Sequence, residues 1–348
     1  MPSVNEELRD RTIRHLVHLN RLSNQESRWL TEKYDSYLWR IIQRYEASDP
    51  RLLRTKKLAE LERSINEILV EFRGESNTAF SNRLREIASN ETEWQERLLN
   101  RTVPVELDTS MPSPEQLRNI IRDEAVQGKY LTDHFTDINE NTRRRVMSEI
   151  RQGVMEGDST EEITRRLRGT KARGYRDGAL ERSRRDADNI ARTMTQYVAN
   201  RAREDHMLAN EDIIKGRQVV ATLDSRTCPM CMGLDGKVLQ LRKGRRPPFH
   251  HRCRCATIPV TKSWRELGID LDEAPEGTRA SMDGQVAASQ TFNDWLKRQP
   301  APVQDEALGP TRGKAYRKGN LSVSEFTDGR GNTITIEEMR QLEPDLFD

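Results

Sequence analysis

The 348-residue sequence is poor in the residues that build a large buried core. Apolar residues make up 34% of the chain and aromatic residues only 5%, and adding glycine still leaves the apolar share below the ~45–50% typical of soluble globular proteins. Charged residues, by contrast, reach 33%. This balance favours long solvated helices over an enzyme built around a large pocket, so we expect an elongated, mainly α-helical molecule.

Long apolar runs and an excess of one charge are also missing. No stretch approaches the ~18 consecutive apolar residues of a membrane span, and the first residues lack the basic start and apolar core of a signal peptide. We therefore expect no membrane contact and synthesis in the cytoplasm. The net charge is only +2, so binding to nucleic acid would need a local basic patch.

Helical periodicity and its interruptions divide the chain into four regions. Prolines and short polar residues at 102–114 have the composition of a linker, and Ser23 with Asn24 predicts a break between two early helices. The predicted regions are a heptad-rich N-terminal helical arm at 1–110, a helical middle region at 111–215, a small α+β Cys/His module at 216–262, and a C-terminal tail with short helices at 263–348.

The arm contains a long apolar stripe. Leucine, isoleucine and aromatic residues recur every three or four positions between Leu58 and Leu98, with Gly74 as a weak point. This spacing predicts one long amphipathic helix, packed as a seam in a helical bundle or, alternatively, self-associated as a coiled coil. Either arrangement makes the stripe a packing surface and not a catalytic site.

Three strands are predicted around the cysteines, at 218–223, 236–239 and 256–260. A Gly- and Asp-containing loop should follow Trp264 up to about Gly284. The module is therefore predicted to be a small sheet that carries all four cysteines of the chain.

The cysteines and two histidines have the spacing of a structural zinc site. Cys228 and Cys231 form a Cys-x-x-Cys pair, and eighteen residues later His250, His251, Cys253 and Cys255 follow. Cys253 and Cys255 face the same side of a strand, so we expect four thiolates around zinc with His250 as a hydrogen-bonding neighbour. His250 is the competing fourth ligand. The candidate ligands are Cys228, Cys231, His250, Cys253 and Cys255.

Two other interpretations of this cluster remain open. The cysteines could be reduced buried thiols without metal. A zinc-stapled nuclease of the His-Asn-His type would need a further His or Asn and an acidic residue, and the last histidine of the chain is His251. Asp224 and Arg226, just before the first cysteine, are expected to orient the cysteine turn through a charge pair or loop hydrogen bonds.

The residues around the cysteines resemble the phage head morphogenesis family, the Mu F-like minor head proteins. The resemblance covers residues 115–262 and includes the helix at 188–203, and the tail near Trp295 is similar to an extension of many relatives. The motifs that carry it are LDSRTCPMC at 223–231, LDG at 234–236 and PPFHHRCRC at 247–255.

This resemblance implies a virion protein, in the capsid interior or at the portal vertex, whose partners are the portal protein and capsid proteins. It implies a role in head assembly, DNA packaging or ejection and no catalytic activity. Some relatives carry an ADP-ribosyltransferase domain, but the last 80 residues here are too few and lack the Glu-x-Glu of that chemistry.

One strongly basic segment stands out on the nearly neutral chain. Residues 165–185 contain nine basic and two acidic residues, a local charge of +7, and glycines predict a mobile loop. The loop is either solvated, paired with an acidic partner surface, or in contact with packaged double-stranded DNA through its phosphates. The candidate DNA contacts are Arg165, Arg166, Arg168, Lys171, Arg173, Arg182, Arg184 and Arg185.

Overall fold

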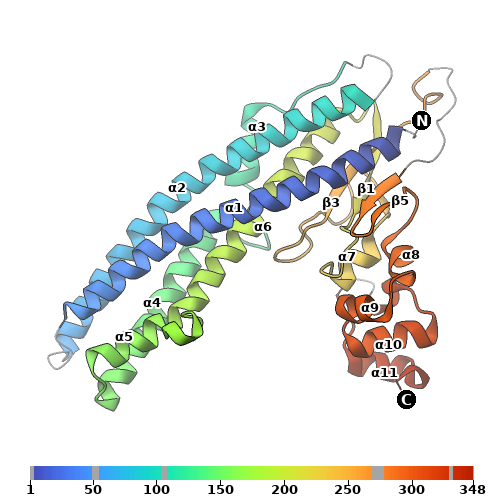
Figure 1. The fold of residues 1–348 in the computed structure, drawn as a ribbon. Coiled ribbons are helices and arrows are strands. Elements are labelled where there is room, and N and C mark those ends of the chain that lie inside the picture. Colours follow the sequence, from blue (N-terminus) through green and yellow to red (C-terminus); the bar gives the residue numbers. More distant parts are fainter. Residues whose placement is uncertain (1–3, 49–54, 103–107, 269–277, 329–331, 348) are drawn as a thin grey trace. The chain divides into compact units, whose positions relative to one another are not determined.

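The computed structural model describes residues 4–48, 55–102, 108–268, 278–328 and 332–347, and helices dominate these residues (Figure 1). The prediction of a mainly α-helical chain with a small α+β Cys/His module is confirmed. The longer helices are α1 (Val4–Glu46), α2 (Thr55–Thr102), α3 (Pro114–Arg122), α4 (Leu131–Glu156), α5 (Thr160–Arg168) and α6 (Ala179–Ala209). The shorter ones are α7 (Pro229–Leu234), α8 (Phe292–Lys297), α9 (Ala301–Leu308), α10 (Pro310–Gly319) and α11 (Ile336–Leu342).

The chain divides into two compact units, each assembled from segments that are distant in sequence. The sheet unit comprises residues 1–20, 90–113 and 199–348, and the helical unit comprises residues 21–89 and 114–198. Helices α1, α2 and α6 each contribute residues to both units. The consecutive domain boundaries drawn from the sequence stay predictions.

An aromatic cluster forms the centre of the helical unit. The rings of Tyr34 and Phe72 lie 4.5 Å apart, and Phe135 lies 6.1 Å from Phe72 and 6.3 Å from Phe80. These four side chains are fully buried. The stripe predicted on α2 is therefore a packing seam within this chain.

Helix α1 has no break at Ser23 and Asn24, so the prediction of two separate helices is wrong. Serine and asparagine each cost less than about 1 kcal/mol in a helix interior, which tertiary contacts readily outweigh. Ser23 is buried, and the Asn24 side chain accepts a hydrogen bond from Arg192 of α6. Neither residue removes a backbone donor as proline would.

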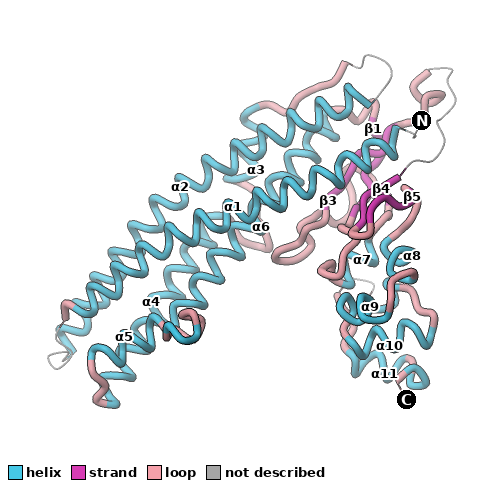
Figure 2. The backbone as a smooth tube through the Cα atoms, in the orientation of Figure 1, coloured by secondary structure: helices cyan, strands magenta, loops and turns pink. Residues whose placement is uncertain are grey.

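The sheet unit contains a three-stranded antiparallel sheet in the order β2-β1-β3, of which Figure 2 labels β1 and β3. Its strands are β1 (Ile214–Val220), β2 (Val238–Leu239) and β3 (Ala256–Thr261), close to the predicted ranges. Gly216 pairs with Val260 and Arg217 with Leu239. The β3 strand is almost continuously buried, and Asn200 and Arg203 of α6 donate hydrogen bonds to the carbonyls of Cys255 and Thr257.

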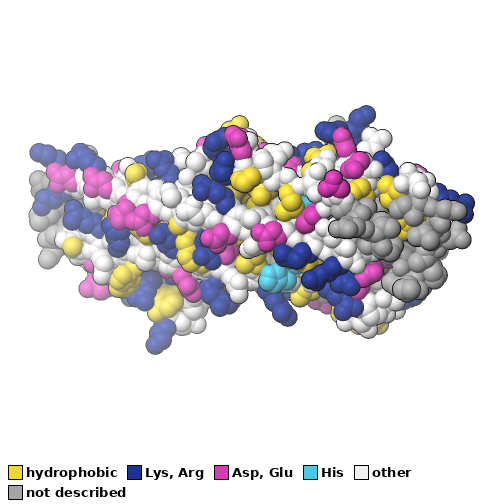
Figure 3. Space-filling model, turned by 90° about the horizontal axis from the view of Figure 1, so that it is seen from above, with side chains coloured by type: hydrophobic (Ala, Val, Ile, Leu, Met, Phe, Trp, Pro, Cys, Tyr) yellow, Lys and Arg dark blue, Asp and Glu magenta, His cyan; other side chains and the backbone are white. Residues whose placement is uncertain are grey.

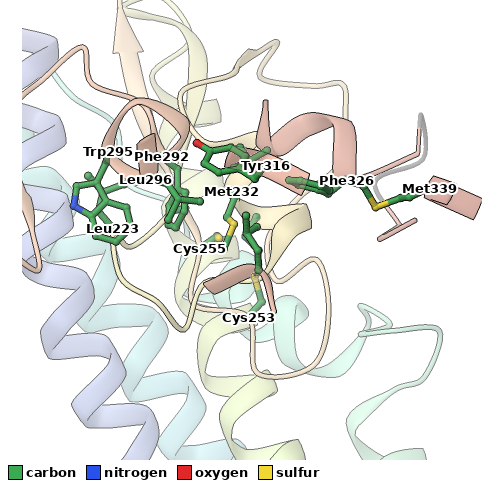
Figure 4. Packing of buried hydrophobic residues seen from close by; sticks show 14 residues of the cluster. Leu223, Met232, Cys253, Cys255, Phe292, Trp295, Leu296, Tyr316, Phe326 and Met339 are labelled. Atoms are coloured by element: carbon green, nitrogen blue, oxygen red, sulfur yellow. Dashed lines mark hydrogen bonds between the residues drawn. The ribbon is translucent and has the colours of Figure 1, made fainter. Parts of the chain in front are cut away.

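The C-terminal segment packs against the Cys/His module. Where a loop was predicted, the described residues form a hairpin of β4 (Thr278–Ser281) and β5 (Gly284–Ala287), while 269–277 lie outside the described residues. Beyond the hairpin, Phe292, Trp295 and Phe326 share one buried core with Met232 of α7, shown in Figure 4. A Cβ on Gly233 would lie 3.3 Å from the Cα of Ser324, so α7 and the C-terminal segment approach closely.

The surface carries both positively and negatively charged side chains. On the face drawn in Figure 3, basic and acidic side chains are interspersed. Among the described residues, no helix combines the length and apolar content that crossing a membrane requires.

Candidate metal centre

The first half of the site is the beginning of helix α7. Cys228 is the N-cap residue, Pro229 occupies the first helical turn, and the Met232 N–H donates to the Cys228 carbonyl over 3.0 Å. Proline suits this position because its missing N–H has no helical partner there. The turn places the thiols of Cys228 and Cys231 close together, Cys228 half-buried and Cys231 buried.

The second half is a tight turn that leads into β3. The Cys253 N–H donates to the His250 carbonyl over 3.2 Å, and Arg252 has a left-handed backbone with φ of 59°. Cys255 directly precedes the first residue of β3. The turn and the strand thereby carry one histidine and two cysteines to the beginning of α7.

The structure brings all five predicted metal ligands into one cluster. The His250 Nε2 atom lies 3.1 Å from the Cys228 sulfur and 3.3 Å from the Cys231 sulfur. The sulfurs of Cys231 and Cys253 are 3.7 Å apart, close to the edge of a tetrahedron with Zn–S bonds of ~2.3 Å. Two groups of ligand atoms have all mutual distances within 4.8 Å: Cys228, Cys231 and His250, and Cys231, Cys253 and Cys255.

His250 is oriented by its own turn. Its Nδ1 lies 2.7 Å from the His251 carbonyl oxygen, which can only accept, so Nδ1 donates and Nε2 faces the sulfurs. Metal-binding histidines are typically held in this way, by a carbonyl or carboxylate on the second nitrogen. Hydrogen bonding to Cys228 and Cys253 raises the pKa of His250 to about 11, so in the absence of metal a proton occupies the position between nitrogen and sulfur.

The four thiols do not ionise alike. Hydrogen bonding from Cys231 lowers the pKa of Cys228 to about 5 and lowers that of Cys253 as well. The pKa of Cys231 is raised because this thiol is the donor to Cys228 and Cys253. A hydrogen bond with Cys231 lowers the pKa of Cys255, but the bond with Cys253 and complete burial outweigh it and raise the pKa. Several neighbouring thiols can all be deprotonated to thiolates only when a nearby cation compensates their negative charge.

An ion pair joins the two halves of the site. Both guanidinium Nη atoms of Arg254 donate to the carboxylate of Asp224 over 2.7 Å. Asp224 also accepts from the Arg226 N–H over 3.0 Å, which shapes the turn before Cys228, as predicted. The Arg226 guanidinium is exposed and 3.6 Å from Asp224, so the main ionic partner is Arg254, which the sequence interpretation missed. Burial would raise the pKa of Asp224, but Arg254 outweighs burial and lowers it.

A second, fully buried ion pair ties the C-terminal segment to the module. Asp235, at the end of α7, accepts from Arg279 over 2.9 and 3.2 Å. The same carboxylate accepts from the N–H groups of Ala221 and Phe292, both over 2.8 Å. Its contacts therefore reach the end of β1, strand β4 and the start of α8. Asp235 belongs to the LDG motif quoted above, but its arginine partner is 44 positions away in the sequence.

The basic segment is more ordered than predicted. Residues 165–168 end α5 and residues 179–185 begin α6, so the prediction of a mobile loop is wrong for these parts. Asp177 accepts from both the N–H and the hydroxyl of Thr170 over 2.8 Å. Gly169 and Gly178 allow a backbone approach in which a Cβ on Gly178 would lie 2.4 Å from the Gly169 nitrogen.

The eight candidate DNA contacts fall into two classes. Arg166 pairs with Asp158 and Glu156, Arg184 with Asp35, and Arg185 with Glu181, while Arg168 lies over the rings of Trp39 and Tyr175. The others form no ion pair within 4.0 Å among the described residues, although Arg165 lies near Glu162 and Arg173 near Asp177: Arg165, Lys171, Arg173 and Arg182. The structure brings these eight residues into the helical unit and not to the metal centre.

Comparison with known proteins finds one similarity. No curated protein and no solved structure matches the chain. Residues 144–258 match the family model described as Phage Mu protein F like protein. The matched segment runs from α4 into β3 and contains both the basic segment and the whole Cys/His cluster. The resemblance inferred from the cysteine motifs is thus confirmed, and over residues 144–258 this chain is similar to the Mu F-like phage head morphogenesis proteins.

Proposed function

We propose that the chain is a minor head protein of a tailed phage that acts in head assembly at the portal vertex. The observation that carries the proposal is the match of residues 144–258, a segment that includes every candidate metal ligand. The partners would be the portal protein and capsid proteins, and the protein would reside in the virion. From that position it would act on the packaging or ejection of DNA.

We further propose that the Cys/His cluster holds one structural zinc ion. Thiolates and imidazole are the donors that zinc prefers, and the cluster offers them from two separate segments. The proposed ligands are Cys228, Cys231, His250 and Cys253, with Cys255 as the alternative to His250. The ion would compensate the charge of the thiolates and join the turn before β3 to α7.

His250 is preferred over Cys255 because of the orientation of its imidazole ring. Its Nε2 points at two of the sulfurs while Nδ1 donates to a carbonyl, the arrangement expected of a ligand. Burial does not separate the candidates, because Cys231, Cys253 and Cys255 all belong to the same buried apolar core.

The ligand set is tested by comparing His250→Ala with Cys255→Ala. Native mass spectrometry of the full chain should find one zinc per chain in the wild type and in Cys255→Ala, and little zinc in His250→Ala. The opposite pattern would assign four thiolates. Absence of zinc from the wild type purified with zinc present would contradict the metal site.

The proposed role is structural and not catalytic. Four protein ligands leave no open position at which zinc could activate water. In the described part of the chain, neither group of ligand atoms includes an aspartate or glutamate. Cleavage of plasmid DNA by the purified chain with magnesium or zinc, abolished by His250→Ala, would overturn this part of the proposal.

The assembly role is tested by co-sedimentation of the full chain with portal particles. We expect the wild type to sediment with them in clearly greater amount than, at the same concentration, with empty capsid shells lacking the portal. Locating the chain by cryo-electron microscopy of virions would give the same information in the particle. Equal recovery with both particles, or with neither, would contradict a role at the portal vertex.

A further inference from the structure

A basic groove in the helical unit is separate from the metal centre. It has a volume of about 880 Å³ and runs between α4, the end of α5 and the start of α6, which lie side by side in Figure 1. Hydrogen bonds from Arg145 of α4 to Ser183 and Asp186 of α6 hold its walls together. Six arginines line it: Arg144, Arg145, Arg166, Arg176, Arg182 and Arg185.

Three of these arginines are already neutralised. Arg145 pairs with Asp186 over 2.9 Å, Arg166 with Asp158 over 2.7 Å, and Arg185 with Glu181 over 3.1 Å. Their guanidinium groups fix the shape of the walls and contribute little net field.

The other three arginines leave their charge available. Arg144 donates to the neutral side chain of Asn141 over 2.7 Å, and for Arg176 and Arg182 the described residues provide no acidic partner. All three side chains are exposed. The groove also contains Glu149, Asp177 and Glu181, of which the last two are engaged by Thr170 and Arg185. Once the three ion pairs are set aside, the three remaining arginines face the carboxylates of Glu149 and Asp177, which leaves an excess of one positive charge.

The chemistry of the walls selects the kind of ligand. No aromatic or large aliphatic side chain lines the groove. Protein interfaces usually need buried aromatic or aliphatic anchors, and single-stranded nucleic acid is usually held by bases stacked on aromatic rings. Arginine guanidinium groups with free N–H donors suit phosphate, because two N–H groups of one guanidinium can bind two phosphate oxygens at once. The ligand that fits these walls best is therefore a phosphate backbone whose bases remain stacked.

We propose that this groove binds the phosphate backbone of double-stranded DNA through Arg144, Arg176 and Arg182, without reading sequence. Two of these residues are not among the eight candidates chosen from the sequence: Arg144 lies on α4, outside the basic segment, and Arg176 lies within that segment but is not one of the eight. The proposal is independent of the portal role, since it concerns the chain alone with DNA.

The test measures binding of the full chain to a fluorescent duplex of random sequence as salt is raised. The groove variant is Arg144→Gln with Arg176→Gln and Arg182→Gln. The control variant removes the same charge from arginines that are paired outside the groove: Arg40→Gln, Arg97→Gln and Arg151→Gln. A triple arginine-to-lysine variant of the groove residues keeps the charge and checks that the surface tolerates substitution.

The groove variant should bind at least tenfold more weakly than the control at low salt. The plot of the logarithm of the association constant against the logarithm of the salt concentration should become less steep by about 2.7, the value for three lost phosphate contacts. The lysine variant should keep most of the affinity, and a single strand of equal length should bind no more tightly than the duplex. Equal binding by groove and control variants would overturn the proposal, as would displacement of the duplex by polyglutamate at equal charge concentration.

Discussion

The two compact units of this chain are held together in different ways. The sheet unit places its charges and thiols inside: the Asp235–Arg279 pair and the Glu91–Arg203 pair are both fully buried, and the cysteine cluster adjoins an apolar core. The helical unit places its aromatic rings inside and most of its ion pairs at the surface, such as Arg40 with Glu71. Stability should therefore rest on a few specific polar contacts in the sheet unit and on many small apolar contacts in the helical unit.

The difference reflects what each sequence region can supply. The helices of the helical unit repeat an apolar side chain every three or four residues, so no single contact is decisive. The sheet unit has five short strands in two small sheets and many loops, whose buried backbone and side-chain groups need particular partners. Losing one such partner leaves an unpaired charge or thiol in a dry environment.

The largest effect should come from the metal centre. Replacing Cys231, which belongs to both groups of ligand atoms, by alanine should abolish zinc binding. The loss of stability should exceed the ~3–5 kcal/mol of a broken buried ion pair, because structural zinc contributes about 10 kcal/mol or more in zinc-finger peptides. Urea unfolding followed by fluorescence measures the loss, with Met230→Ala as the control. A Cys231→Ala chain that unfolds like the control would contradict the comparison.

The buried pair of Asp235 and Arg279 should have the next largest effect. Asp235→Asn keeps the shape but leaves the Arg279 guanidinium buried without its carboxylate, a loss of about 3–5 kcal/mol. The matched control is Asp305→Asn, which breaks the partly exposed pair with Arg317 and should cost about 1 kcal/mol or less. Similar losses for the two variants, measured by urea unfolding, would remove the distinction between buried and exposed pairs.

A pH-dependent effect is expected at Glu91. Burial would raise the pKa of this carboxyl, but Arg203 and His15 outweigh burial and lower it to about 2. Its unfolded pKa is near 4.5, so its charge stabilises the folded state above pH 4.5, and about 3 kcal/mol is lost as the pH falls from 4.5 to 2. His15 also stacks on Trp94 at 3.8 Å, which keeps the imidazole beside the carboxylate.

Unfolding free energies measured across this pH range test the expectation. Glu91→Gln should be less stable at neutral pH and should show a flatter decline between pH 4.5 and 2 than the wild type. Glu93→Gln, which removes an exposed carboxylate on the same helix, should follow the wild type. Parallel curves for wild type and Glu91→Gln would show that Glu91 does not contribute.

The smallest effect is expected in the helical unit. Arg40 binds Glu71 through two hydrogen bonds of 3.0 and 2.7 Å, but both side chains are more than 40% exposed. Arg40→Gln should therefore cost no more than about 1 kcal/mol in urea unfolding. A loss above 2 kcal/mol would show that surface pairs matter as much here as buried ones do in the sheet unit.

The local elements could be predicted from the sequence because their causes are local. The apolar stripe of α2 and the strands around the cysteines follow from the spacing of apolar residues along the chain. The Cys-x-x-Cys motif and the distant His and Cys residues also meet as predicted, because their spacing is that of a metal site whose ligands come from two segments. The continuity of α1 could not be predicted, since it depends on contacts with other helices.

The long-range polar contacts could not be predicted for a physical reason. Arg254 and Arg279 stand among many arginines, and nothing in their neighbours shows that Asp224 and Asp235 are their partners. The pairing of Glu91 with Arg203 spans 112 positions. Such contacts depend on how several elements pack in the folded chain, and the neighbouring residues in the sequence do not show which partner will be close. The same reason explains why Arg144 joins the basic groove although it lies outside the basic segment.

Hydrogen exchange of the full chain, with zinc bound and after its removal by a chelator, tests the central claim most directly. If a metal ion joins α7 to the turn before β3, removal of zinc should greatly accelerate exchange of backbone amides in residues 219–260, while amides of α2 within residues 61–88 keep their protection. Unchanged protection in residues 219–260 after complete removal of the metal would contradict the claim.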